Sequence, residues 1–218
     1  MSMDSGRRSR PDDVPSVERL LTLSDGVVAI ALTLLVLQLK VPSVAQVADP
    51  ASPSELAMQL GKGADQLASY LISFYVIAQF WMVHYQVFGQ VAGQREGLAW
   101  WNFAFLLTIT VMPFTSSLLG QYSANPLAVD IFAVNLLLAS LATQATLVFG
   151  RRKGLLFPGS DVAMRRAEWA RATATALVIG LSIGLAWVST SMAMYCWLLL
   201  AFAPRAVDRW FVRQAAPR

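Results

Sequence analysis

The sequence VERLLTLSDGVVAIALTLLVLQL, residues 17–39, decides the fold class of this chain. From Val27 to Leu37 it is apolar on every side, which is typical of a helix buried in a bundle or a membrane. Its length matches the roughly 20 residues that a helix needs to cross about 30 Å of hydrocarbon. The stretch is too long for the apolar region of a signal peptide and contains Asp25, so we interpret it as a retained membrane-spanning helix.

The composition of the whole chain agrees with a membrane protein. Of its 218 residues, 56% are apolar and 14% are charged, whereas a soluble domain carries about 25% charged residues. We therefore predict an all-α membrane protein. Further spans are expected at about 64–91, 98–119, 128–150, 169–188 and 190–206. The break between the last two rests on Ser189-Thr190-Ser191, and a hairpin is favoured because one long helix would not fit a bilayer.

The positions of the basic residues predict the orientation of these six spans. Of the 17 Lys and Arg residues, all except Lys40 and Lys62 fall on one side of the predicted membrane. The positive-inside rule makes that side cytoplasmic and puts both termini there. We expect a disordered cytoplasmic tail over 1–16, a six-helix channel domain over 17–212 and a cytoplasmic tail over 213–218. Nucleic-acid binding is not expected, because no basic helix carries interleaved aromatic residues.

A few polar side chains lie inside the predicted spans, and each is a functional candidate because polar groups are costly there. They are Arg19, Ser24, Asp25, His84 and Asn102, and the alternating direction of the first three spans puts them at one depth. Arg19 and Asp25 are about 240° apart around a helix, so they should reach neighbouring helices, with His84 and Asn102 as partners. They form either a proton or ion site or a brace between helices, and we favour the brace.

Enzyme chemistry finds little support in the same residues. Ser24 lacks a glycine-flanked nucleophile elbow, and its neighbour Asp25 is misplaced for orienting a distant histidine. With one histidine and one cysteine, Cys196, the chain cannot assemble a metal-hydrolase cluster or a disulfide. We therefore expect neither an enzyme nor a cofactor.

One stripe of the first span suggests a different use. Ile30, Leu34 and Leu37 share a helical stripe, with Thr33 at its edge. Because the helix is apolar all round, periodicity does not identify the face that matters. If the helix lined a symmetric pore, the stripe would form stacked apolar rings that gate by dewetting.

The segment Arg19–Leu37 resembles the signature of the prokaryotic relatives of the lysosomal potassium channel, the transmembrane protein 175 family. Trp81, His84 and Phe88, then Asn102 and Pro113-Phe114, match the family further along the chain. Two departures stand out: Leu23 replaces the usual phenylalanine, and Gln38 stands where an acidic residue is common near the outer mouth.

The resemblance implies a homotetramer of six-helix subunits whose first helices line a central pore for potassium. It implies that Ile30, Leu34 and Leu37 are constriction positions and that Thr33 belongs to a layer linked to selectivity. It also implies that Arg19, Ser24, Asp25 and His84 support the first helix.

We therefore expect a passive potassium channel in a bacterial plasma membrane. Its expected partners are potassium ions, the lipid bilayer and further copies of the chain. A proton-coupled secondary transporter that uses Asp25 and His84 is the main alternative, and it predicts saturable, pH-driven uptake. A non-conducting membrane scaffold is the third possibility, and it predicts no flux.

Overall fold

The computed structural model describes residues 16–93, 95–157 and 162–201, and its regular elements are helices. The α-helices are α1 (Val17–Val36), α2 (Pro53–Gly61), α3 (Ala64–Phe88), α4 (Glu96–Gln121), α5 (Pro126–Arg152), α6 (Val162–Ala186) and α7 (Thr190–Cys196). Two 3-10 helices cover Val44–Gln46 and Trp197–Ala201. Residues 1–15 of the predicted N-terminal tail and the predicted tail 213–218 lie outside the described residues. Ser16, which we assigned to that tail, is the N-cap of α1.

Five of the described helices are long and apolar enough to cross a membrane: α1, α3, α4, α5 and the part of α6 over Glu168–Ala186. They correspond to the first five predicted spans. The sixth, predicted over 190–206, is represented by the shorter apolar helix Thr190–Leu200, and residues 202–206 lie outside the described residues. The described part of the chain therefore carries five candidate spans, and the sixth stays a prediction.

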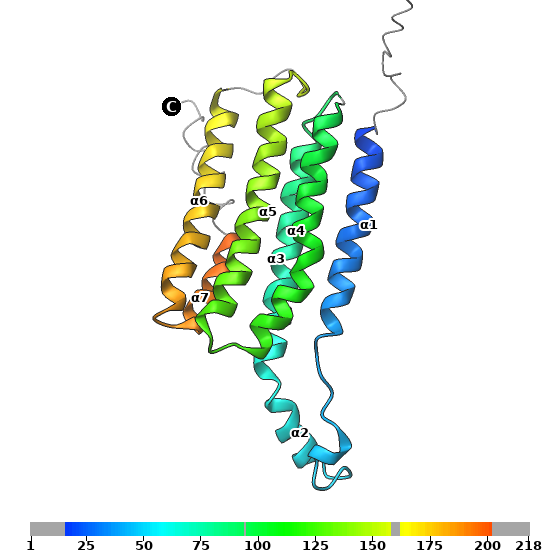
Figure 1. Ribbon diagram of the computed structural model, residues 1–218, viewed down its shortest axis with the longest axis vertical. Helices are drawn as coiled ribbons and strands as arrows, with labels where there is room; N and C mark the ends of the chain where they lie inside the picture. Colours follow the sequence, from blue (N-terminus) through cyan, green and yellow to red (C-terminus); the bar gives the residue numbers. More distant parts are fainter. Residues whose placement is uncertain (1–15, 94, 158–161, 202–218) are drawn as a thin grey trace, which may run out of the picture.

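The long helices run side by side as a bundle. Figure 1 shows α1 at one edge of the bundle and α6 with α7 at the opposite edge. Between them, α3, α4 and α5 share a core of fully buried side chains that includes Ile77, Ile109 and Leu136. Lipid tails are as apolar as leucine, so close van der Waals packing rather than a hydrophobic driving force holds such helices together.

The chain turns sharply between α6 and α7, as the predicted break requires. The backbone N–H of Ser189 donates to the carbonyl of Leu185 at 2.8 Å, and the Ser189 side chain accepts from the N–H of Met192. Beyond the turn, the buried Trp197 donates from Nε1 to the hydroxyl of Ser182 at 2.9 Å. These contacts fold α7 back on α6 as a hairpin.

Two loops at the other end of the bundle pair with each other. Val91 and Leu156 form an isolated antiparallel bridge. The backbone N–H of Ala92 donates to the carbonyl of Leu155 at 2.7 Å, and that of Phe157 donates to the carbonyl of Gln90 at 3.0 Å. The pairing joins the α3–α4 loop to the segment that follows α5.

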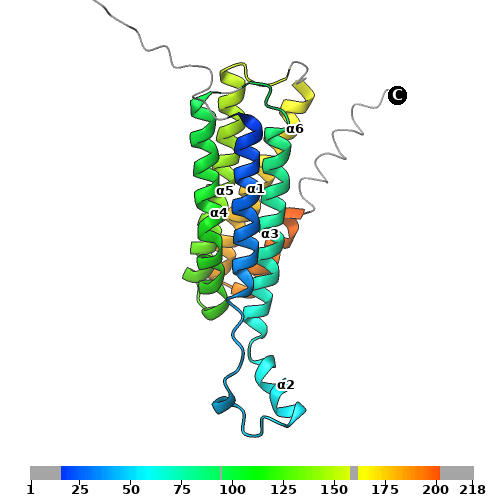
Figure 2. The same cartoon turned by 90° about the vertical axis from the view of Figure 1, so that its right-hand side faces the viewer.

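The segment between α1 and α3 leaves the bundle altogether. We call residues 37–63 the excursion; Figures 1 and 2 show it projecting beyond the ends of α1 and α3. It contains α2, which begins with Pro53 in its first turn.

Candidate functional site

Helix α1 has a buried face and an exposed face. Its buried residues are Leu20, Ser24, Val28, Ala31 and Leu35, and the helix packs against α3 and α4. A spacing of three or four residues marks one stripe of an α-helix, so the opposite stripe points away from the core. Figure 2 shows α1 in front, running alongside α3 and α4 and between them.

The exposed face holds the four residues predicted to line a pore. Ile30, Leu34 and Leu37 are 60%, 44% and 75% exposed. Thr33 is exposed as well, and its hydroxyl donates to the carbonyl of Ile30 at 2.8 Å. An uncovered apolar stripe of this kind meets lipid, another subunit or the water of a pore.

Three of the predicted polar residues meet behind the buried face of α1. Ser24, His84 and Asn102 are buried and come from α1, α3 and α4. Asn102 Oδ1 lies 2.7 Å from His84 Nε2 and 3.1 Å from the Ser24 hydroxyl, which also donates to the carbonyl of Leu20 at 2.7 Å. Asn102 thus joins three helices through one oxygen.

The imidazole of His84 is packed among aromatic rings. Its ring centre lies 4.4 Å from that of Phe105, in a stacked arrangement, and 4.5 Å from that of Phe88. Together with the Asn102 contact, these rings enclose a side chain that is 2% exposed. In the protomer, His84 is therefore a packed core residue and does not face open space.

Asp25 has a partner that the sequence did not predict. The indole N–H of Trp81 donates to Asp25 Oδ1 at 2.8 Å, so the carboxylate ties α1 to α3. In the described part of the chain, no hydrogen bond joins Asp25 to His84. Hydropathy does not reveal this contact, because the large apolar side chain of Trp81 conceals its one hydrogen-bond donor. The match of Trp81 to the family pattern was the available signal.

Arg19 stands apart from the other polar residues. It lies exposed in the first turn of α1, and its side chain forms no hydrogen bond or ion pair with another described residue. Among the described residues, no group of three or more His, Cys, Asp or Glu side chains is placed to hold a metal ion.

The Gln38 side chain is used within the protomer. Its Nε2 donates to the carbonyl of Pro113 at 2.5 Å, which ties the end of α1 to α4. The Gln38 amide therefore serves as a contact between helices.

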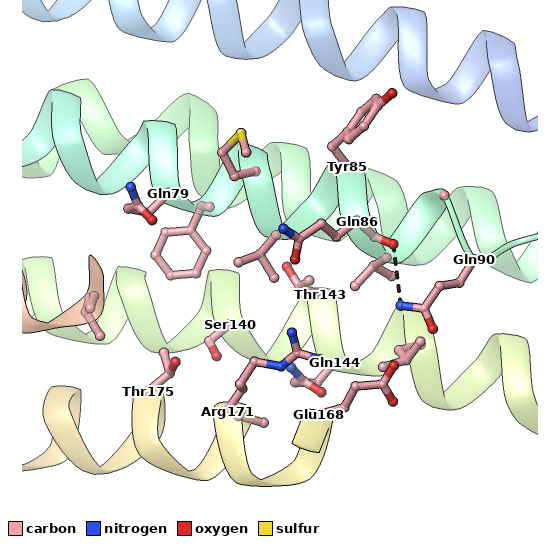
Figure 3. Close-up of a pocket in the computed structure, with 18 of the residues that line it drawn as sticks. Gln79, Tyr85, Gln86, Gln90, Ser140, Thr143, Gln144, Glu168, Arg171 and Thr175 are labelled. Carbon is pink, nitrogen blue, oxygen red and sulfur yellow. Dashed lines mark hydrogen bonds between the residues drawn. The ribbon is translucent and has the colours of Figure 1, made fainter. Parts of the chain in front are cut away.

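A cavity of about 570 Å³ lies on the far side of α3 from α1, between α3, α5 and α6. Figure 3 shows polar side chains lining it: Gln79 and Gln86 from α3, Ser140 and Gln144 from α5, and Arg171 and Thr175 from α6. Glu168 lies at one end of the cavity and forms an ion pair with Arg151 that links α5 to α6. Leu200, near the last described residue, also lines the cavity.

Comparisons with known proteins cover the exposed stripe of α1 and the polar residues behind it. The family model described as "Endosomal/lysosomal potassium channel TMEM175" matches residues 19–113, which hold the exposed stripe and the polar residues around Asn102. A potassium channel of Streptomyces collinus is 35% identical over 188 residues, which cover 84% of this chain and 88% of that protein.

The human endosomal/lysosomal proton channel TMEM175 is a more distant relative. It is 28% identical over 131 residues, which cover 59% of this chain and 25% of the human protein. Among solved structures, the TMEM175 homologue from Chamaesiphon minutus, described as a lysosomal potassium-selective channel homologue, superposes with a TM-score of 0.71 at 23% identity. The match covers 88% of this chain and 98% of that one, and it supports the fold.

Proposed function

This chain belongs to the TMEM175 family, and we propose that it is a potassium-permeable cation channel that conducts passively and without a cofactor. The resemblance read from residues 19–37 is confirmed by the family model and by the relatives. The bacterial relative that matches most of the chain is named a potassium channel, which supports potassium as the conducted ion and a bacterial plasma membrane as its location.

The exposed stripe of α1 is the observation that carries the mechanism. In a homotetramer with α1 at its centre, Ile30, Leu34 and Leu37 of the four subunits form stacked apolar rings around the axis. Such rings hold back ions while they are dry and pass them when they are wet. Thr33 lies between the first two rings and is the one polar side chain of the stripe, so it is the position where potassium and sodium are distinguished.

The polar residues behind α1 act as a brace in this proposal. Asn102 holds Ser24 and His84, and Trp81 holds Asp25, so α1 is fixed to both neighbouring helices at one depth. An interhelical hydrogen bond in a membrane is worth about 0.6–2 kcal/mol. Several of them together keep the rings in register, and Arg19 marks the cytoplasmic end of the helix.

We keep the sixth span, predicted over 190–206, as part of the proposal. Residues Thr190–Ala201 extend about 20 Å, which falls short of the roughly 30 Å of hydrocarbon. The described part of the last predicted span is therefore too short to cross the bilayer by itself, and the six-span topology stays a proposal.

Topology is tested by cysteine labelling in a Cys196→Ser background. Ala216→Cys should react with a membrane-impermeant maleimide only from the cytoplasmic side, and Ala45→Cys only from the outside. Labelling of both from the same side would overturn the six-span topology.

Liposome flux tests the conduction mechanism. Purified protein should pass potassium down its gradient, and Ile30→Asn should increase the flux because a polar ring stays wet. Thr33→Ala should change the ratio of potassium to sodium flux. Flux that is unaffected by polar substitutions at all three rings would overturn the pore assignment, and absence of flux from the purified oligomer would favour a scaffold.

A proton-linked function is the second candidate, because the human relative is named a proton channel. If the protein is instead a proton-coupled transporter, Asp25 and His84 carry the proton. Uptake should then be saturable and pH-driven, and it should be lost in Asp25→Asn. The Trp81 contact to Asp25 and the enclosure of His84 favour the brace. A current that reverses at the potassium equilibrium potential distinguishes the channel from the transporter.

A further inference from the structure

Helix α2 leaves its large apolar side chains uncovered in the protomer. It has nine residues and none of them is buried, and Leu56, Met58 and Leu60 are among the exposed large apolar side chains. Isolated helices shorter than about 12–15 residues are marginal in water. Glu55 of this helix is held by the backbone of Asp49, but the exposed apolar side chains are left free to meet a surface outside the protomer.

The exposed apolar surface continues from α1 into the excursion. Leu37 is followed by Val41 and Val44, which are 86% and 73% exposed. Figures 1 and 2 both show the excursion beneath α1 and α3, and Figure 1 shows it on the side of the bundle away from α6. If α1 lines the axis of a tetramer, the segment that follows it stands beside that axis at the mouth of the pore.

We propose that the four excursions of a tetramer pack against one another as a collar around the outer mouth of the pore, so that the partner of α2 is a second copy of this chain. The proposal rests on the proposed function, because the arrangement of α1 around an axis brings the excursions together. The apolar side chains of α2, with Val41 and Val44, supply the contact between neighbouring copies.

The charges of the excursion suit contact with a copy of itself. Lys40 and Lys62 balance Asp49 and Glu55, and Glu55 already accepts a hydrogen bond from the backbone N–H of Asp49 at 2.8 Å. A helix that lies on an anionic bilayer carries Lys and Arg on its polar face. The nine residues of α2 contain Glu55 and no basic residue, so a membrane surface fits it less well.

Disulfide cross-linking in membranes tests the collar. In a Cys196→Ser background, cysteines introduced singly at Leu56, Met58 and Leu60 should give cross-linked dimers on a denaturing gel after mild oxidation. Neighbouring copies raise the effective concentration of the second thiol, so the yield should exceed that of a distant site by about tenfold. Met82→Cys is the matched control, because its side chain is exposed but lines the cavity on the other side of α3.

A second cysteine separates this proposal from the proposed function. Leu37→Cys, at the end of the pore stripe, should also cross-link if α1 lines the axis. Cross-linking at Leu37 with none at the three α2 positions would overturn the collar and leave the pore. Absence of cross-linking at both would overturn the arrangement around α1 itself.

Tetramer stability and contact of α2 with lipid provide two further tests of the collar. Replacement of Leu56, Met58 and Leu60 together by serine should weaken the tetramer on native gels, while the fold of the bundle, followed by circular dichroism, stays intact. A fluorophore on Met58→Cys should be insensitive to brominated lipids. Strong quenching would mean that α2 lies on the bilayer, and the collar would be wrong.

Discussion

Helices α1 and α5 are equally apolar and differently covered. Their spans have the same mean hydropathy, yet 28% of the span is buried in α1 and 56% in α5. Helix α5 contacts α3, α4, α6 and α7, whereas α1 contacts α3 and α4. Hydropathy therefore identifies a span without saying what surrounds it.

The difference has a functional meaning when the two exposed surfaces are compared. The outward side chains of α5, such as Leu138, belong to a helix that is held on several sides, and we expect them to meet lipid. The outward stripe of α1 belongs to a helix at the edge of the protomer, with a polar layer fixing its other face. We propose that this stripe meets pore water, and the following substitutions test the distinction, from the largest expected effect to the smallest.

Leu34 and Leu35 are adjacent residues on opposite faces of α1. Leu35 is fully buried, so Leu35→Ala should lower the free energy of unfolding by about 2–4 kcal/mol through the cavity it leaves. Leu34→Ala should change stability by less than about 1 kcal/mol and should raise potassium flux, because it widens a ring. Unfolding in detergent and liposome flux measure the two effects. Equal loss of stability in both variants with unchanged flux would contradict the separation of the faces.

Asn102 distinguishes the brace of α1 from ordinary packing around α5. Asn102→Leu should lower the free energy of unfolding by about 1–3 kcal/mol, because it leaves the buried His84 Nε2 without its partner and removes the link from Ser24 to α4. Asn135→Leu is the matched change on α5, where a single amide donates to the carbonyl of Thr108 at 3.1 Å. Its cost should be smaller, about 0.6 kcal/mol. The same unfolding assay compares them, and equal costs would mean that Asn102 is no special junction.

The contact between Trp81 and Asp25 should be worth less than the Asn102 layer. Trp81→Phe keeps an aromatic ring and removes the indole N–H, so we expect a loss of about 0.5–1.5 kcal/mol in the free energy of unfolding. Trp100→Phe is the control, since Trp100 is exposed and should tolerate the change. Thermal unfolding of the purified protein measures both changes. If the unfolding midpoint of Trp81→Phe equals that of the wild type, the Trp81 contact does not contribute to the brace.

Leu138 provides the smallest expected effect. This residue of α5 is half exposed, much as Leu34 is on α1. Leu138→Ala should leave potassium flux unchanged and stability within about 0.5 kcal/mol of the parent. A flux change as large as that of Leu34→Ala would show that the exposed side of α1 is not distinctive.

The spans, the turn at Ser189 and the depth of the polar residues could be predicted from the sequence. The apolar lengths of the first five spans are visible in hydropathy, and the turn at Ser189 follows from three consecutive small hydroxyl residues. Ser24, His84 and Asn102 share one depth because consecutive spans alternate in direction, and the structure joins them by hydrogen bonds.

Other features depend on tertiary contacts that a single sequence does not reveal. The face of α1 that is buried was undetermined, because Val27–Leu37 is apolar all round. The partner of Asp25 was missed, since an indole N–H leaves no trace in hydropathy, and Arg19 was expected in a network that the described contacts do not include. The Gln38 bond to Pro113 was equally hidden, because it joins positions 75 residues apart.

The backbone pairing between the two loops beside Val91 and Leu156 has a consequence for amide hydrogen exchange. Surface loops ordinarily exchange their amide protons quickly, since water competes for them. Here the N–H groups of Ala92 and Phe157 are held by carbonyls of the opposite loop, so they exchange only when both loops open together. The exchange rates of these two amides therefore measure how often the two loops separate from each other.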